Sequence, residues 1–148
     1  MRSIFDSDER ARILRRLQTL RPNTRARWGR MTASQMVCHL IDAVESSAHP
    51  PTGPAGTGVL THFPIKQLVI YWLPWPKARL QSPPELLVTT PTAWDADLAR
   101  LTDAIARAAA RSPHAPWPHS DVFGPLSGRQ WGALLRTHID HHLRQFGV

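Results

Sequence analysis

Three of the eight histidines in the chain lie close together near its end, at positions 138, 141 and 142. His138 and His142 are four residues apart, so on a helix their imidazole rings would project from the same face. A neutral imidazole offers a lone pair to a divalent metal, whereas two rings buried without partners would be costly. The H-x-x-x-H spacing alone is weak evidence, because it occurs by chance on many helices. The alternative is a pair of core histidines bonded to backbone or to a carboxylate.

The residues around this pair, 131–146, separate into two faces when they are placed on a helix at about 100° per residue. Both histidines fall in the middle of the apolar stripe, opposite Arg136, Asp140 and Arg144. The stripe consists of Trp131, Leu134, Leu135, Ile139, Leu143 and Phe146. This central position strengthens the hypothesis of a metal site, and the alternative of two bonded core histidines stays open.

A catalytic zinc site has three protein ligands and one open position. His39 is the best candidate for the third ligand, because it lies beside the apolar stripe of another amphipathic segment. Cys38 points roughly away from that stripe and is a poor candidate. We interpret His141, which is displaced from the centre of the last stripe, as an outer neighbour of the metal or a surface residue. His119, in the preceding loop, could contact substrate or act as an acid or base, although loop histidines are more often solvated.

The elements that must position these residues are predicted to be helices, since no segment alternates convincingly between apolar and polar residues. Capping-box patterns mark three helix starts, at Thr32–Gln35, Thr92–Asp95 and Ser127–Gln130. The sequence therefore predicts an all-α fold of four main helices and one short helix, with long loops rich in proline. The expected helices are 6–19, 32–47, 62–73, 92–111 and 127–146, and the expected loops are 50–61, 74–91 and 112–126.

The length of 148 residues predicts a single domain, 1–148. We expect a cytoplasmic protein, since one cysteine cannot form an internal disulfide and neither a secretory signal nor a membrane-spanning run is recognised. The net charge of +7 and the arginines of the first thirty residues could indicate nucleic-acid binding. That hypothesis is disfavoured, because no helix-turn-helix pattern and no aromatic-rich strand accompany them. The apolar segment 63–73 could pack on its own bundle or on a second subunit, which would give a homodimer.

A histidine midway along the second helix and H-x-x-x-H on the last one resemble the DinB-like superfamily, which includes the YfiT-like metal hydrolases and thiol-dependent S-transferases. The segments MTASQMVCHLIDAVE, LPWPKARLQSPPELL and FGPLSGRQWGALLRTHIDHHLRQFGV resemble a bacterial branch of it, a domain of unknown function. The resemblance covers most of the chain from Trp28 to Val148, and HIDHHLRQFG is its most specific part. It implies a four-helix bundle in up-down-down-up order with a divalent metal, commonly zinc or nickel, at one end. Carried over position by position, the metal ligands are His39, His138 and His142.

The resemblance further implies an enzyme acting on small molecules, with a low-molecular-weight thiol activated at the metal as cosubstrate, or hydrolysis by metal-bound hydroxide. A hydrolytic base would be an acidic residue near the metal. Asp42, one turn after His39, is the nearest candidate, and it could instead orient a ligand imidazole. Two alternatives remain: a non-catalytic bundle that binds a metal or small ligand in a stress response, and an arginine-rich nucleic-acid binder.

Overall fold

The computed structural model describes residues 2–49, 58–72 and 88–148, and within these ranges it contains five α-helices and no strand. The helices are α1 (Ser7–Thr19), α2 (Ala33–Glu45), α3 (Ile65–Tyr71), α4 (Trp94–Ala110) and α5 (Gly128–Gln145), and a 3-10 turn, η1 (Val59–Thr61), precedes α3. The all-α prediction is therefore confirmed for the described part of the chain.

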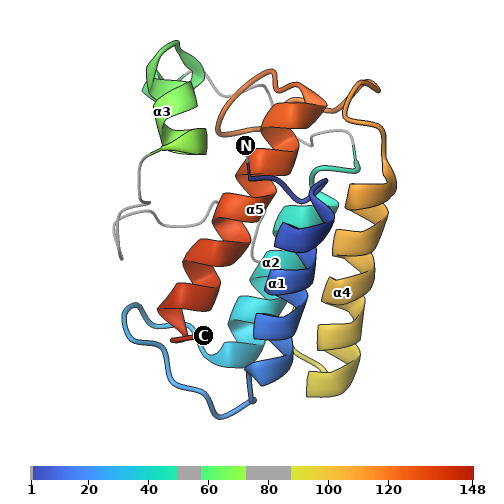
Figure 1. Cartoon of the computed structure of the whole chain (residues 1–148). Helices are drawn as coiled ribbons and strands as arrows, with labels where there is room; N and C mark the ends of the chain where they lie inside the picture. The colour runs from blue at the N-terminus through green and yellow to red at the C-terminus, as the bar shows by residue number, and fades with distance from the viewer. Residues whose placement is uncertain (1, 50–57, 73–87) are drawn as a thin grey trace.

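The four longer helices lie side by side, and the short α3 lies against α5 (Figure 1). In this view α1 and α5 run downward, while α2 and α4 run upward. α2 packs along α4, and α5 packs against both α1 and α2. All five helices contribute side chains to one cluster of buried apolar residues, so α5 is held from several sides.

Two of the three predicted capping boxes are present and determine where the site-bearing helices begin. The Thr32 hydroxyl accepts a hydrogen bond from the backbone N–H of Gln35, whose side-chain oxygen accepts one from the backbone N–H of Thr32. Ser127 and Gln130 form the same reciprocal pair before α5. Each pair satisfies two of the N–H groups that a helix leaves free at its start.

The third predicted capping box, Thr92–Asp95, is wrong. The residue before α4 is Ala93, which provides no side-chain cap. Instead, the buried carboxylate of Asp97 accepts hydrogen bonds from the backbone N–H of Thr92 at 2.9 Å and from its hydroxyl at 2.8 Å. The Thr92 hydroxyl is therefore a donor to a residue inside the helix rather than an acceptor for the helix end.

The predicted helix 62–73 is shorter in the structure, and the predicted loop 50–61 contains η1 at its end. Residues 50–57 of that loop and 73–87 of the following segments lie outside the described residues. Lys66 joins α3 to the segment that precedes α5. Its buried ammonium group donates hydrogen bonds to the carbonyls of Phe123 at 3.1 Å and Pro125 at 2.6 Å. Phe63 and Trp72, at the ends of this segment, are each 80% exposed.

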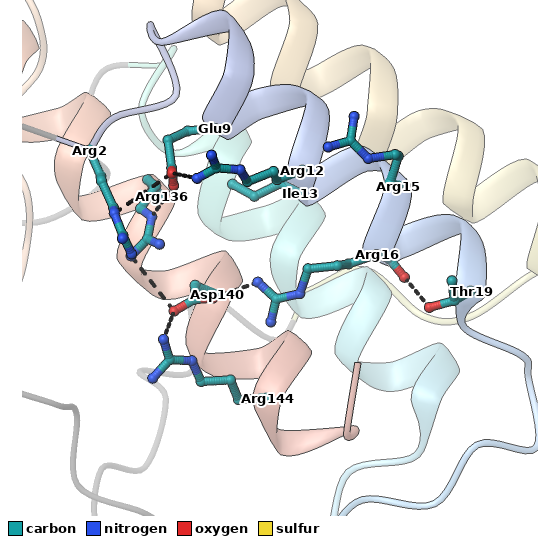
Figure 2. A pocket seen from close by; sticks show the side chains of 10 residues that line it. All are labelled: Arg2, Glu9, Arg12, Ile13, Arg15, Arg16, Thr19, Arg136, Asp140 and Arg144. Carbon is teal, nitrogen blue, oxygen red and sulfur yellow. Dashed lines mark hydrogen bonds and ion pairs between the residues drawn. The ribbon is translucent and has the colours of Figure 1, made fainter.

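The charged face of α5 is covered as well as its apolar face. Asp140 is buried and pairs with Arg16 of α1 and with Arg144 one turn along α5 (Figure 2). Arg136 contacts both Glu9 of α1, at 3.1 Å, and Asp140, at 3.6 Å. The charges opposite the histidine pair thus join α5 to α1. Among the described helices, none is long and apolar enough to cross a membrane.

Replacing Asp97 with alanine should lower the free energy of unfolding by about 1.5–3 kcal/mol, the usual range for hydrogen bonds to a charged group. The matched control is Asp103→Ala, which removes an exposed carboxylate from the same helix and should change stability by less than about 0.5 kcal/mol. Urea denaturation followed by circular dichroism measures both variants. Equal unfolding midpoints would contradict the anchoring role of Asp97.

Candidate metal centre

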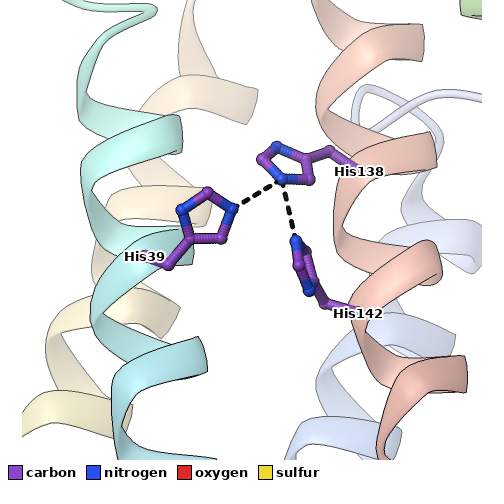
Figure 3. Close-up of side chains that lie close together, drawn as sticks. All are labelled: His39, His138 and His142. Atoms are coloured by element: carbon purple, nitrogen blue, oxygen red, sulfur yellow. Dashed lines mark hydrogen bonds between the residues drawn. The ribbon is translucent and has the colours of Figure 1, made fainter. Parts of the chain in front are cut away.

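The candidate metal centre lies where α2 faces α5. His39 comes from the middle of α2, and His138 and His142 come from successive turns of α5 (Figure 3). The Nε2 atom of His138 lies 2.9 Å from Nε2 of His39 and 3.1 Å from Nε2 of His142. One ligand atom from each of the three residues lies within 4.8 Å of the other two. Our prediction that helix packing brings His39 to the pair is confirmed.

These separations suit a single ion. Two nitrogen ligands at about 2.0–2.1 Å from a tetrahedral zinc are separated by roughly 3.3 Å, so the observed 2.9 and 3.1 Å require only small side-chain movements. Figure 3 shows the three rings directed toward one another across the space between the helices. Three histidines that lie this close together could hold a metal ion.

Burial keeps His138 and His142 in the neutral form that a metal requires. His39, His138 and His142 are only 2%, 9% and 7% exposed. Burial lowers the pKa of His138 well below its usual value, and the neighbouring charges of His142 and His39 lower it further. Burial, followed by the charge of His39, lowers the pKa of His142 to about 3. At neutral pH these two imidazoles are therefore uncharged, and each retains a lone pair.

A second contact fixes which nitrogen of His142 faces the cluster. Its Nδ1 lies 2.8 Å from Oε1 of Gln145, an oxygen that can only accept, so Nδ1 carries the proton. Gln145 is itself oriented, because its Nε2 donates to the carbonyl of Trp28 at 2.7 Å. The lone pair of His142 is therefore on Nε2, toward His138. Such outer contacts commonly set the tautomer of a metal-ligating histidine.

Gly29 makes room for this arrangement. Its φ is +82°, a conformation that residues with side chains rarely adopt, and a Cβ atom there would lie 2.6 Å from Nε2 of Gln145. Gln145 was not predicted from the sequence as a partner of His142. The spacing of three residues between them on a helix was the available signal.

The proton inventory at the centre also favours a cation. His138 has one nitrogen that contacts both neighbours, and a neutral ring could offer at most one proton there. A proton on Nε2 of either His39 or His138 could serve only one of the two contacts of His138, whereas a cation would be met by three lone pairs. The donor set of this structure therefore fits a divalent metal that favours nitrogen ligands.

The other predicted site residues lie outside this group of three. The carboxylate of Asp42 accepts hydrogen bonds from the backbone N–H groups of Val88 and Thr89, each at 2.9 Å, and from the Thr89 hydroxyl. It thereby holds the chain that leads to α4. Cys38 is buried, and burial together with the charges of Asp97 and Asp42 raises its pKa, which disfavours the thiolate that would bind a metal.

The two other predicted site histidines, His119 and His141, do not belong to the group of three. His141 is half-buried, and its ring lies against those of Trp28 and His142, with centroid separations of 5.9 and 5.2 Å. Burial lowers its pKa, an effect partly opposed by the charge of Asp140. His119 is half-buried in the loop before α5. The interpretation of these two as outer or substrate-contacting residues stays a prediction.

In comparisons with protein-family models, with curated proteins and with solved structures, the chain matches none. The interpretation of the metal centre therefore depends on its own geometry.

Adding zinc at a free concentration of 100 times its dissociation constant should stabilise the folded wild-type protein by about 2.7 kcal/mol, because the ion binds the folded chain preferentially. His138→Ala removes the nitrogen that contacts both others and should abolish this effect. His114→Ala, at an exposed histidine outside the group, should retain it. Thermal unfolding with and without zinc compares the three proteins. Equal stabilisation of the His138→Ala protein would exclude the triad as the zinc site.

Gln145→Ala should weaken metal binding by about 10- to 100-fold, the usual effect of removing a partner that orients a ligand. Gln145→Glu keeps an acceptor for His142 and should recover part of the affinity, which a loss of packing alone would not predict. Gln18→Ala, on the exposed side of α1, is the control. Competition with a zinc-chelating dye gives the affinities. Unchanged affinity in Gln145→Ala would show that this contact does not orient His142.

Proposed function

We propose that the protein is a divalent-metal-dependent enzyme of the DinB-like superfamily that acts on small molecules. Its reaction would be a thiol-dependent S-transfer or a hydrolysis at the centre formed by His39, His138 and His142. The single observation that carries this proposal is the convergence of three buried histidine nitrogens from α2 and α5.

The order of the helices supports the proposed family. α1 and α5 run in one direction and α2 and α4 in the other, which is the sequence of directions expected for the up-down-down-up bundle (Figure 1). The histidines occupy the second and the last of these four helices, as in the resemblance noted above.

The chemistry follows from the charge of the ligands. Three neutral imidazoles would leave a bound zinc or nickel ion with its full charge, which lowers the pKa of a bound water to about 7 and deprotonates a bound thiol. The chain's own residues hold the geometry: His39 is fixed on α2, the pair is fixed on α5, and Gln145 orients His142. Asp42 is engaged by Val88 and Thr89, and no described carboxylate joins the group of three. This arrangement favours thiol transfer over hydrolysis assisted by a carboxylate base.

One observation favours a second candidate, a non-catalytic protein that binds a metal or a small ligand. The three rings are at most 9% exposed. Two hollows on the described surface, one between α1 and α5 and one at residues 22–33, have none of these histidines in their walls. A closed centre is expected of a structural or sensing site, whereas a catalytic ion needs an open position.

Protein purified without a histidine tag should contain about one zinc or nickel ion per chain, and the His138→Ala/His142→Ala protein should contain almost none. Elemental analysis measures this content, with His114→Ala, at an exposed histidine outside the group, as the control that keeps its metal. Absence of metal from the wild type, even after incubation with zinc and nickel, would overturn the proposal.

Cobalt substitution then separates the enzyme from the binding protein. A small thiol added to the cobalt protein should alter the visible spectrum if the ion has an open position, and the metal-loaded protein should catalyse transfer of that thiol to an electrophile. A spectrum that does not respond to thiol, with no transfer or hydrolysis, would support the non-catalytic candidate.

A further inference from the structure

On the side of α5 away from the histidines, a pocket of about 410 Å³ lies between α1 and α5 (Figure 2). Its volume is within the range of small-molecule sites. Its charges are unusually one-sided, because six guanidinium groups face two carboxylates. The carboxylates are those of Glu9 and Asp140, and the arginines are Arg2, Arg12, Arg15, Arg16, Arg136 and Arg144.

The two carboxylates account for the more buried arginines. The side chain of Arg136 is 14% exposed and lies between both carboxylates, 3.1 Å from Glu9 and 3.6 Å from Asp140. Arg16 is bound to Asp140 and also donates to the carbonyl of Val148 at 2.7 Å. At the bottom of the pocket, the two negative charges of Glu9 and Asp140 are therefore neutralised by the two positive charges of Arg16 and Arg136, and these contacts hold the side chains in place.

Four further arginines at the rim of the pocket have no additional carboxylate to neutralise them. The side chains of Arg2, Arg12 and Arg144 are 67%, 59% and 65% exposed, and each shares a carboxylate that is already paired with others. The Arg15 side chain is also exposed and has no hydrogen bond or ion pair with any other described residue. The pocket therefore carries four positive charges in excess, with guanidinium N–H groups that are free to donate. Arginine donates two parallel hydrogen bonds to phosphate and carboxylate groups.

We propose that this pocket binds a small anion with two or more phosphate groups. Several phosphate charges on one small molecule would match the excess of four, and the pocket's volume limits the ligand to that size. An extended nucleic acid would instead contact a positive surface that continues beyond the pocket. Outside the pocket, the guanidinium groups of Arg10 and Arg27 each donate to a backbone carbonyl, those of Ile4 and Gly147.

The proposed anion site is independent of the metal centre. Asp140 is two residues from both His138 and His142, and residues two apart on a helix do not face each other. The two sites can therefore be tested separately, and failure of one does not affect the other.

Calorimetric titration with inorganic pyrophosphate at low salt should show one saturable site. Because pyrophosphate also binds metals, the titration is repeated in the His138→Ala/His142→Ala protein, where the same binding is expected. Arg15→Gln combined with Arg144→Gln should weaken binding by at least about tenfold, since each loses hydrogen bonds to a charged group. Arg129→Gln, at an exposed arginine of α5 outside the pocket, should leave the affinity unchanged.

Three results would overturn the proposal: no saturable binding, binding that disappears with the histidine pair, or equal affinities in the Arg15/Arg144 and Arg129 variants. A last experiment measures the binding of a labelled DNA duplex of about 20 base pairs and its competition with pyrophosphate. Displacement of the duplex by pyrophosphate would support a phosphate pocket. Tight DNA binding that pyrophosphate does not displace, with an affinity that falls steeply with salt, would assign the arginines to nucleic acid instead.

Discussion

Three imidazole rings share a space that excludes most water, and the packing of α2 on α5 depends on how they are accommodated. Their centroids are 4.8–4.9 Å apart, so a proton on one ring opposes protonation of the next. Burial and this mutual opposition favour the neutral form of His138 and His142, and a cation between the rings would serve all three. A slide of one helical turn, about 5.4 Å, between α2 and α5 would remove His39 from the cluster. The contact between His39 and the pair on α5 therefore requires one register between the two helices.

The rest of the structure keeps α5 in this register. On one side, Gln145 links His142 to the backbone of Trp28, in the segment before α2. On the other side, Asp140 and Arg136 connect α5 to α1. Lys66 ties α3 to the loop that leads into α5. Polar contacts from three other segments therefore reinforce the apolar stripe of a single helix, and a preorganised ligand set benefits from this kind of support.

The sequence was sufficient to predict the parts of the structure that depend on local patterns. The capping boxes at Thr32 and Ser127 and the apolar periodicity located α2 and α5, and the position of the histidine pair within the stripe identified two members of the triad. His39 was also found, because it lies beside its own apolar stripe. The errors arose where a partner outside the local pattern determines the role of a residue. The pattern at Thr92 resembled a helix cap, but the Thr92 hydroxyl donates a hydrogen bond to Asp97 instead of accepting one at the helix start. The roles of Glu9 and Asp140 depend on which helix faces them, and that information is absent from either helix alone.

The separation of the histidines along the chain has a consequence for biosynthesis. His39 and His138 are 99 residues apart, although their nitrogens are in contact. During synthesis, α2 leaves the ribosome before α5 has been made, so His39 is at first without His138 and His142. An ion held by all three residues could be acquired only after residue 142 has been made. Any metal that bound earlier would have a single ligand from this set and would exchange readily. Loading of such a centre would therefore follow the synthesis of α5, and it would distinguish chains that contain α5 from those that stopped before it.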